Sequence, residues 1–525
     1  MKTLRHLTNT AFVVSLALLA SCSSDNDIEV NNENNNNNAN VPAEKLRFSA
    51  TVEPNVVSRA TLNQDDNTLH WDANDKIAVY SPKANKIEEF TVESQYAGQT
   101  VAYFSSDKPS TLTPPDNSGS FPYYYAFYPA EAVKGLATAS SSSAYNRAQG
   151  YIPTEQKVTE GYTYDKSAIL MMARATPAEK AFSFQNVNAL VKVTITNNDN
   201  GKVKYIKLFA NNEKLMTGTA TFWITTSVGT SLTSGADTKN YVQLEIPASS
   251  GSVDYYLSVH QNTFDAGFTL LLESEFDETT HSQSIYQRVN KNSIQFAKSN
   301  IYNLGDYDVS RLKYLNNVVD LDLPSNTIWT TKNLEDGDNG KAKFVDDFYS
   351  YGGYYSWGET STKATNAYNQ NNYPLYNKKD AYNTSNVLKT DYDVAYQMNS
   401  VYRIPSYSQF TELLNAGFTQ TNTLSGNGNR GIKFTNSKGR YIWFPAGGCN
   451  YANITGSSSV HDAGTMAQYW SRTVHHSNSE PNAETYAKCF DISSSGEYSH
   501  GILSGTGKGY DRRFAGKSIR PVLYK

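Results

Sequence analysis

Several features that would point to particular functions are absent from this sequence. The net charge is -4 and no stretch concentrates basic residues, so there is no electrostatic case for binding nucleic acid. Long apolar runs with a 3.6-residue period are few, and 38 tyrosines and 22 phenylalanines favour strands over helices. The glycine-rich residues 426–431 lack a following Lys-Ser or Lys-Thr, which predicts a hairpin loop rather than a phosphate-binding loop. No reactive constellation stands out, so the sequence predicts a protein that is not an enzyme and uses no cofactor.

The N-terminus has the features of an export signal. Two basic residues precede an apolar run, residues 11–19, that is too short to span a membrane as a helix. The run ends in Leu-Ala-Ser-Cys, which resembles the lipobox of bacterial lipoproteins. The resemblance implies removal of a signal peptide, residues 1–21, and acylation of Cys22, which would hold the chain in the outer membrane at the cell surface. An ordinary secreted chain is the alternative. The Asn-rich residues 22–44 predict a solvated tether.

A strand followed by an exposed loop opens the folded part of the chain. Leu46, Phe48 and Ala50 alternate with polar residues, which is the period of two of a half-buried strand. A proline ends the pattern, and the polar residues after it predict an exposed loop. The bond between Arg59 and Ala60 lies in that loop, so we expect an Arg-specific protease to reach it.

Several motifs between residues 45 and 311 resemble the fimbrillins, the type V pilin family. They are RFSATVEPNVVSRAT (47–61), WDANDKIAVYSP (71–82), FPYYYAFYP (121–129), YIPTEQ (151–156), LMMARA (170–175), FSFQNVNALVKVTITN (182–197) and YYLSV (255–259). The resemblance implies two transthyretin-like β-sandwiches in series, residues 45–170 and residues 171–311. Short alternating strands separated by Asn, Gly and Asp turns indicate sandwiches independently.

The fimbrillin resemblance also implies a mode of assembly. In that family a lipidated precursor is cut after an arginine that follows the first strand, and Arg59 matches this position. The cut would remove the first strand and let other pilin subunits supply a replacement by donor-strand exchange. Anchor subunits of the family stay uncut and lipidated, so the alternative is that Arg59 is an ordinary loop arginine.

Residues 312–525 carry a second set of motifs. They are VDLDLPSNTIWTTKNLED (319–336), YYSWGET (354–360), YRIPSYSQFTELLNAG (402–417), YIWFPAGG (441–448), YWSRT (469–473) and SIRPVLYK (518–525). In this order they resemble the Fibrobacter succinogenes major paralogous domain, which implies an α+β, C-type-lectin-like fold related to that of formylglycine-generating enzyme. Two positions depart from the family pattern: Asp322 stands where Gly is usual, and YWSRT replaces YWSST, which introduces Arg472. A fully standard pocket is therefore not implied.

One helix in this region is predicted from its own residues. Ser406 and Gln409 form the pattern of a capping box, and Gly417 supplies a left-handed stop. Phe410 and Leu413 begin an apolar stripe at helical spacing. The stripe predicts core packing rather than chemistry.

Residues 349–402 are rich in tyrosine and asparagine. Aromatic rings and amides give contact area at low entropic cost together with adaptable hydrogen bonds, and sugars stack on such rings. The candidate ligand-binding residues are Tyr351, Tyr355, Tyr368, Tyr373 and Tyr376. The alternative is that these loops only cover the fold.

Two further patterns leave alternatives open. The turn at residues 335–340 offers hard oxygen ligands, with Asp336 and Asp338 as weak calcium candidates, but it lacks the spacing of an EF-hand and also fits a solvated acidic turn. Cys449 and Cys489 could pair in an exported domain, closing a loop worth up to ~4 kcal/mol, or remain buried free thiols. A nucleophile built from Cys449 with His461 or His475 has nothing in the sequence that fixes its geometry.

Together these features predict a minor or tip subunit of a type V pilus that acts as an adhesin. Its expected partners are other pilin subunits and a carbohydrate or another host or bacterial surface ligand. The alternatives are an uncut, lipid-anchored pilus subunit and a stand-alone surface lipoprotein that binds glycans. A further alternative is an enzyme that uses the formylglycine-generating-enzyme-like fold.

Overall fold

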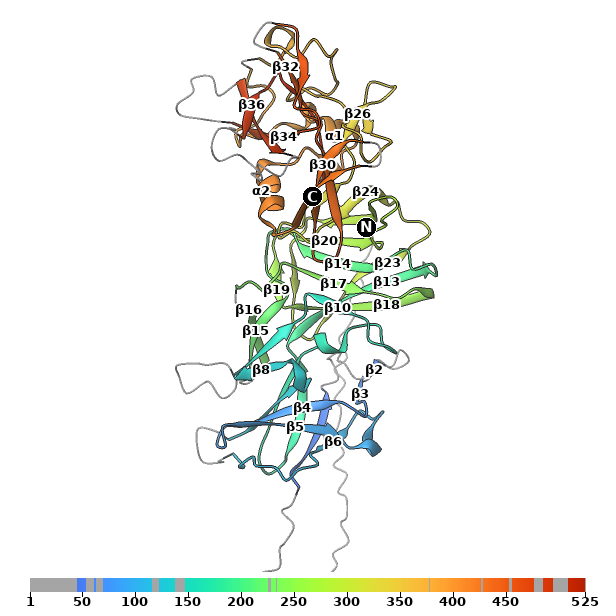
Figure 1. Ribbon diagram of the computed structural model, residues 1–525. Helices are drawn as coiled ribbons and strands as arrows, with labels where there is room; N and C mark the ends of the chain where they lie inside the picture. The colour runs from blue at the N-terminus through green and yellow to red at the C-terminus, as the bar shows by residue number, and fades with distance from the viewer. Residues whose placement is uncertain are drawn as a thin grey trace, which may run out of the picture. The chain divides into compact units, whose positions relative to one another are not determined.

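Strands form most of the regular structure of this chain. A computed structural model describes residues 45–52, 61–62, 69–115, 122–136, 147–224, 228–232, 234–376, 378–425, 428–452, 456–475, 485–493 and 509–524. Strand accounts for 48% and helix for 7%, which confirms the predicted mainly β fold class. Figure 1 shows the order of the elements along the chain. None of the helices among the described residues is long and apolar enough to cross a membrane.

The strands of the first region close into a barrel. They are β1 (Arg47–Val52), β4 (Lys76–Ser81), β5 (Lys86–Val92), β6 (Ala102–Ser105), β7 (Tyr124–Tyr128), β11 (Met171–Ala175) and β12 (Ala181–Asn186). Neighbours follow the order β1-β12-β11-β7-β4-β5-β6, and β6 pairs back to β1. Apolar and polar residues alternate in a barrel as they do in a sandwich, so the predicted sandwich pattern is compatible with this closed sheet.

The outer face of the barrel packs against a separate sheet of order β16-β15-β9-β8. Its strands are β8 (Val133–Leu136), β9 (Arg147–Ile152), β15 (Gly218–Ile224) and β16 (Val228–Leu232). Phe127 of the barrel meets Phe222 of this sheet with ring centroids 5.8 Å apart. The boundary that we predicted at residues 170/171 does not divide these elements, because β11 and β12 follow it and still belong to the barrel, whereas β9 precedes it and pairs with β15.

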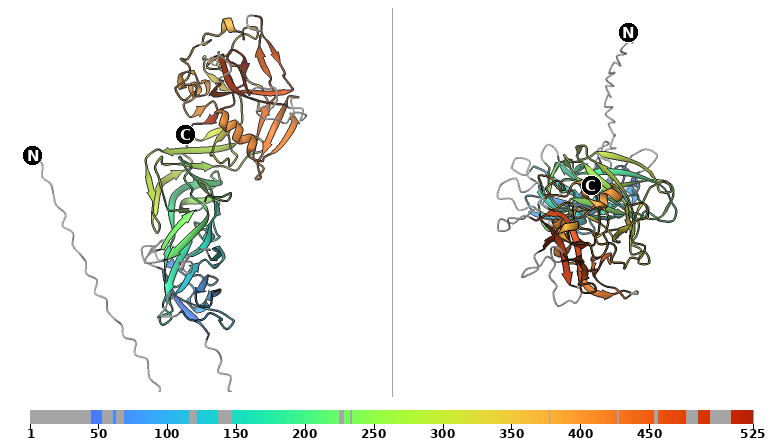
Figure 2. Two further views of the ribbon diagram at one scale, coloured as in Figure 1. Left: turned by 90° about the vertical axis from the view of Figure 1, so that its left-hand side faces the viewer. Right: turned by 90° about the horizontal axis from the view of Figure 1, so that it is seen from above.

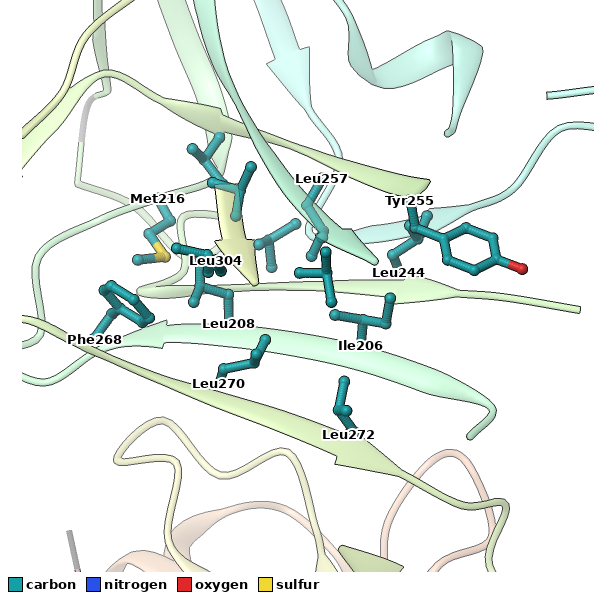
Figure 3. Close-up of a cluster of buried hydrophobic side chains, with 14 of the residues drawn as sticks. Ile206, Leu208, Met216, Leu244, Tyr255, Leu257, Phe268, Leu270, Leu272 and Leu304 are labelled. Carbon is teal, nitrogen blue, oxygen red and sulfur yellow. The ribbon is translucent and has the colours of Figure 1, made fainter. Parts of the chain in front are cut away.

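The next region is a sandwich of two sheets. A sheet of order β18-β13-β23, made of β13 (Asn188–Asn198), β18 (Ser249–His260) and β23 (Ile301–Asp308), forms one layer. The other layer contains β10 (Glu155–Lys157), β14 (Tyr205–Ala210), β17 (Tyr241–Glu245), β20 (Phe268–Glu273) and β21 (Gln283–Asn290). Figure 3 shows Ile206, Leu208, Leu257 and Leu270 pointing into the space between the layers, where all four are buried.

The second layer of this sandwich continues into the C-terminal region. Its sheet runs β10-β17-β14-β20-β21-β24-β25-β38-β28, and the added strands are β24 (Leu315–Asp320), β25 (Ile328–Thr330), β28 (Tyr402–Arg403) and β38 (Val522–Leu523). β24 pairs with β21 through Gln283 opposite Val318 and Ile285 opposite Leu315. Figures 1 and 2 show the sandwich strands of this sheet in green to yellow-green and the C-terminal region that follows them in yellow to red.

A shared core lies on the far face of that sheet. Phe209, Leu271 and Ile285 alternate along their strands with residues of the sandwich core, so they point to the opposite side. There they pack in one buried cluster with residues of the C-terminal region that include Trp357 and Trp470. The C-terminal region is therefore joined to the sandwich by a continuous sheet and by a common core.

The C-terminal region also forms several small sheets of its own, and it contains the two α-helices found among the described residues. Its strands are β26 (Leu334–Asp336), β27 (Ala342–Phe344), β29 (Thr419–Leu424), β30 (Arg430–Thr435), β31 (Tyr441–Pro445), β32 (Cys449–Tyr451), β33 (Ser459–His461), β34 (Met466–Val474), β35 (Tyr486–Ser493), β36 (Tyr510–Arg512) and β37 (Gly516–Lys517), and α1 spans Val394–Met398. Short strands elsewhere are β2 (Thr61–Leu62), β3 (Leu69–His70), β19 (Asn262–Phe264) and β22 (Ile294–Phe296).

The predicted helix is present as α2 (Tyr407–Asn415). Ser406 accepts a hydrogen bond from the backbone N–H of Gln409, and the Gln409 side chain accepts one from the Ser406 backbone N–H, which confirms the capping box. Phe410 and Leu413 are buried, as the apolar stripe predicts. Gly417 has φ +70, the left-handed conformation that glycine adopts readily after a helix.

Candidate functional site

The first candidate site is the position that β1 occupies in the barrel. On one side β1 runs parallel to β12, with Ala50 opposite Phe182. On the other side it runs antiparallel to β6, with Phe48 opposite Phe104. Because both ladders are formed, β1 is an interior strand of the sheet although it comes first in the described sequence.

The side chains of β1 fill the centre of the barrel. Phe48 is fully buried, and its ring centroid lies 5.0 Å from that of Phe90, 5.1 Å from that of Tyr124 and 5.1 Å from that of Phe182. Ala50 is 1% exposed, so the same face of the strand carries one large and one small buried side chain. We call this position the β1 site.

The polar face of β1 is anchored by Arg47. Its guanidinium donates from Nε and Nη2 to the two carboxylate oxygens of Glu93, each at 2.7 Å, and stacks over the ring of Tyr103 at 3.8 Å. The hydrogen bonds and positive charge of Arg47 lower the pKa of Glu93 below its ordinary value, and they outweigh burial, which acts to raise that pKa. Arg47 therefore has a defined structural role within the strand.

Three residues of the processing prediction lie outside the described residues. They are Cys22, the predicted lipidation site, and Arg59 and Ala60, the predicted cleavage site. The roles of all three stay predictions.

Three of the five tyrosines that we predicted to bind a ligand are instead core residues. Tyr355, Tyr368 and Tyr373 are 0%, 1% and 3% exposed. The hydroxyl of Tyr373 donates to the backbone carbonyl of Trp357 at 2.5 Å, and that of Tyr368 donates to the carbonyl of Tyr354. All three rings contribute apolar area to the interior, and the hydroxyls of Tyr368 and Tyr373 satisfy backbone acceptors. The ligand-binding prediction is therefore wrong for these three.

The other two candidate tyrosines, Tyr351 and Tyr376, are partly exposed. Tyr351 packs its ring against Gly447, where an added Cβ would lie 3.1 Å from the Tyr351 Cβ, and its carbonyl accepts a hydrogen bond from Ser518. Both remain candidates for contact with a ligand, but the structure does not gather them with the three buried tyrosines on one surface.

The acidic turn that we considered for calcium is held by protein donors. The carboxylate of Asp336 accepts hydrogen bonds from the backbone N–H of Thr362 at 3.0 Å and from its hydroxyl at 2.6 Å. Asp338 is exposed. Across the described residues, no group of three or more His, Cys, Asp and Glu side chains is arranged to hold a metal ion. The structure thus gives Asp336 the role of a loop acceptor.

The two cysteines of the C-terminal region are buried free thiols, so the disulfide that we considered is not formed. They lie on different sheets: Cys449 is opposite Lys517 in β37, and Cys489 is opposite Trp470 in β34. The Cys489 thiol donates to the carboxylate of Asp491 at 3.3 Å. Each thiol is therefore accommodated by its own sheet.

Cys449 also lies directly across a ladder from His461. The imidazole of His461 is instead 3.1 Å from the hydroxyl of Ser459 and stacks against Tyr451 with ring centroids 4.4 Å apart. Burial raises the pKa of the Cys449 thiol to about 12, so the thiol stays protonated near neutral pH. This arrangement gives no activated thiolate.

A second buried arrangement, which the sequence analysis did not identify, lies at the end of β24, where the sandwich sheet continues into the C-terminal region. Lys207 donates to the carboxylate of Asp320 and, at 3.0 Å, to that of Asp322. Arg440 lies 3.8 Å from Glu273 and donates to the backbone carbonyl of Asp320 at 3.1 Å. The side chains of Lys207, Glu273 and Asp320 have no solvent exposure. We call these five residues the junction cluster.

The ionisation of the junction cluster follows from its burial. Burial and the nearby Asp320 raise the pKa of Glu273 to about 8, and the cations oppose that rise only in part. Burial also acts to raise the pKa of Asp322, but Lys207, Lys438 and Arg440 outweigh it and hold that pKa below its ordinary value. Two carboxylates and two cations therefore compensate one another, with Glu273 protonated near neutral pH.

Asp322 connects this cluster to the departure seen in the sequence. Its φ is +57, in the left-handed region that glycine prefers and that Asp adopts more easily than most residues. A glycine would fit this backbone but would bring no carboxylate to Lys207 and Lys438. The sequence around Lys207 does not show that this lysine is buried. Lys207 lies on the same face of β14 as Tyr205 and Phe209, and the sequence does not show that another region covers this face.

The β1 site and the junction cluster are the features to set beside known proteins. No protein-family model matches the chain, and no match is found among curated proteins. Solved structures that are similar include a protein from Bacteroides uniformis, provisionally named a cell adhesion protein, with 14% identity, a TM-score of 0.31 and coverage of 52% of this chain and 97% of that one. A provisionally named cell adhesion protein from Bacteroides ovatus has 12% identity and a TM-score of 0.33, with coverage of 52% of this chain and 96% of that one. A fimbrial protein from Bacteroides ovatus has 11% identity and a TM-score of 0.22, with coverage of 92% of this chain and 100% of that one. These TM-scores are low, and we base the functional proposal on this chain's own residues.

Proposed function

We propose that this chain is a surface fimbrial subunit in which β1 is exchanged for a strand of a neighbouring subunit. The observation that carries the proposal is the position of β1, a short strand at the start of the described chain that lies between two partners and fills the barrel core. The proposal takes the lipid anchor on Cys22 and the cut after Arg59 from the sequence.

Loss of β1 would convert the β1 site into a strong acceptor. The backbone groups of β6 and β12 that pair with β1 would be left open, and an extended strand from another chain can satisfy them. The pocket around Phe48 would also lose an aromatic side chain, whose burial is worth ~1.5 to 3 kcal/mol. The best incoming strand should therefore place a large apolar residue and a small one on the same face.

The strand pairing favours a subunit that accepts a strand but does not donate one. β23, the last strand of the sandwich, pairs with β13 and is followed at once by β24, which is fixed in the continuous sheet. β38 pairs on both sides, with β25 and β28. A subunit with no strand to donate would occupy the end of a fimbria, where the C-terminal region would act in adhesion.

Two alternatives differ from this proposal in one covalent event. An anchor subunit or a stand-alone glycan-binding lipoprotein would keep β1 and its lipid. A tip subunit would lose both when the bond between Arg59 and Ala60 is cut.

The experiment is a comparison of Arg59→Ala with the wild type in cells that make fimbriae. We expect wild-type protein from sheared fimbriae to begin at Ala60, and Arg59→Ala to stay in the membrane fraction. Arg311→Ala is the matched control, because Arg311 is an arginine with 85% of its side chain accessible to solvent. Normal assembly of Arg59→Ala, or fimbriae in which the chain still contains β1, would contradict the proposal.

A further inference from the structure

Two adjacent cavities of about 250 and 370 Å³ share the side chains of Arg472 and Tyr524. The larger one, which we call the Arg472 cavity, is lined by polar and charged groups that include Asn383, Lys389, Thr390, Arg403, Arg472 and Tyr524. Its size falls within the ~300 to 1,000 Å³ typical of sites for small molecules. The Arg472 cavity therefore has room for a small ligand.

The Arg472 side chain is half-buried, and its Nε lacks a hydrogen-bond partner among the described residues. The Arg472 backbone N–H donates to Pro405 at 2.8 Å, and its carbonyl accepts from Leu388 at 2.9 Å, so both sides of the strand are fixed. Its Nε is buried, and no acceptor among the described residues reaches it. Burial, reinforced by Arg403, lowers the pKa of Arg472 from its ordinary value. A buried donor without an acceptor is costly, and a bound anion would supply the missing acceptor.

The charge around Arg472 is unbalanced. Arg403 is compensated, because its Nε donates to the buried carboxylate of Asp393 at 2.8 Å and its Nη2 donates to the carbonyl of Leu388 at 2.9 Å. Lys389 adds a third cation to the lining, and no carboxylate lines the Arg472 cavity within the described part of the chain. Glu213 lines the smaller cavity. The larger cavity is thus the one suited to a negative group.

Tyr524 gives the cavity an aromatic wall. Its side chain belongs to an exposed large residue, 42% accessible, and the Arg403 guanidinium lies 5.3 Å from the ring centroid. A partly open ring offers a flat apolar face. The Oδ1 of Asn383 already accepts from the backbone N–H groups of Ser385 and Val387, so its Nδ2 can donate to a ligand hydroxyl, and the hydroxyl of Thr390 can donate or accept. A ring of carbon atoms that bears hydroxyls matches these three groups.

We infer that the Arg472 cavity binds an acidic saccharide, with the Arg472 guanidinium on the carboxylate and the Tyr524 ring against the sugar. An arginine presents parallel donors that match the two oxygens of a carboxylate. The inference goes beyond fimbrial assembly, since it requires neither cleavage at Arg59 nor exchange of β1. It also gives a role to the arginine that distinguishes YWSRT from the usual motif.

The test is isothermal titration of the full-length protein with glucuronate, with glucose as the neutral counterpart and inorganic sulfate as a simple anion. We expect glucuronate to bind and glucose to bind at least roughly tenfold more weakly, because a charged hydrogen bond is lost. Arg472→Ser should weaken glucuronate binding by roughly tenfold to a hundredfold. Arg430→Ser is the matched control, since Arg430 is exposed on β30 outside both cavities.

Tyr524→Ala provides a second variant on the rim of the cavity, and it decides the matter if Arg472→Ser does not fold by circular dichroism. It should also weaken glucuronate binding and leave sulfate binding unchanged. The inference is overturned if wild-type protein fails to bind glucuronate at millimolar concentration, if glucose binds equally well, or if sulfate binds and glucuronate does not. Equal binding by a folded Arg472→Ser variant would overturn it too. None of these outcomes bears on fimbrial assembly, which the Arg59→Ala comparison tests separately.

Discussion

Lys207 of β14 and Asp320 at the end of β24 form an ion pair in which neither side chain is exposed to solvent. The two residues are 113 positions apart in the sequence and come from the sandwich and the C-terminal region. Burying either charge alone would be strongly unfavourable, because its desolvation would not be offset by an opposite charge. The two side chains are therefore buried only when they are together. The pair therefore couples correct docking of the C-terminal region to the folding of the sandwich.

Removing one partner of this pair should destabilise the protein strongly. We expect Lys207→Met to lower the free energy of unfolding by ~3 to 5 kcal/mol, because it leaves the buried carboxylate of Asp320 without its ion-pair partner. The double variant Lys207→Met with Asp320→Leu should recover much of the loss. Urea denaturation measures both. Lys76→Met, which removes an exposed pair with Glu89, is the control and should cost less than ~1 kcal/mol. A double variant no more stable than Lys207→Met would contradict this account.

Truncating Phe48 should weaken the barrel locally. Phe48→Ala removes a fully buried ring that contacts three other aromatic rings, and a change of this kind costs ~3 to 5 kcal/mol. We expect faster hydrogen exchange of the backbone amides in β6 and β12. Ser49→Ala, on the polar face of the same strand, should leave exchange nearly unchanged. Equal protection in both variants would show that β1 contributes little to the barrel.

The buried tyrosines of the C-terminal region should affect stability through their hydroxyls. Tyr373→Phe leaves the carbonyl of Trp357 without the donor it has at 2.5 Å, so we expect a loss of ~1 to 3 kcal/mol. Thermal unfolding followed by circular dichroism measures it. Tyr376→Phe, at a partly exposed position, is the matched control and should fall within ~0.5 kcal/mol of wild type. A Tyr373→Phe variant as stable as the control would argue against a structural role for that hydroxyl.

The stability of the sandwich should fall in mild acid because of His260. Burial lowers the pKa of His260 to about 4 from an ordinary value of 6.5, so the unfolded state binds more protons between these two values. The stabilisation is complete above pH 6.5 and is lost as the pH falls toward 4, with ~2 kcal/mol lost between pH 7 and pH 5. His260→Met should remove this part of the pH dependence in urea denaturation. The same slope in both proteins would exclude His260 as its source.

Local patterns predicted the parts of this structure that depend on neighbouring residues in the chain. The capping box and apolar stripe of α2 and the alternating face of β1 are set by spacing within a few residues, and both are confirmed. The tyrosines of residues 349–402 show the limit of such patterns. A ring buried with its hydroxyl on a carbonyl and a ring on the surface have the same sequence signal.

Long-range pairing accounts for what the sequence could not show. Lys207 lies on the same face of β14 as Tyr205 and Phe209. That face is buried only because β24 and Arg440 pack beside it in the folded structure. Arg472 was noted in the sequence within YWSRT, but its cavity is formed by segments near residues 383–390, 403 and 524. Spacing along the chain carries no information about such convergence.

The continuous sheet from β10 to β28 has a mechanical consequence. Two domains joined by a flexible linker can rotate independently, so a force on one is not passed on as a torque to the other. Here the C-terminal region has no such freedom, because bending at the junction would break the β21–β24 ladder and open a common core. A force applied to a ligand bound by the C-terminal region would therefore be transmitted to the sandwich as a torque.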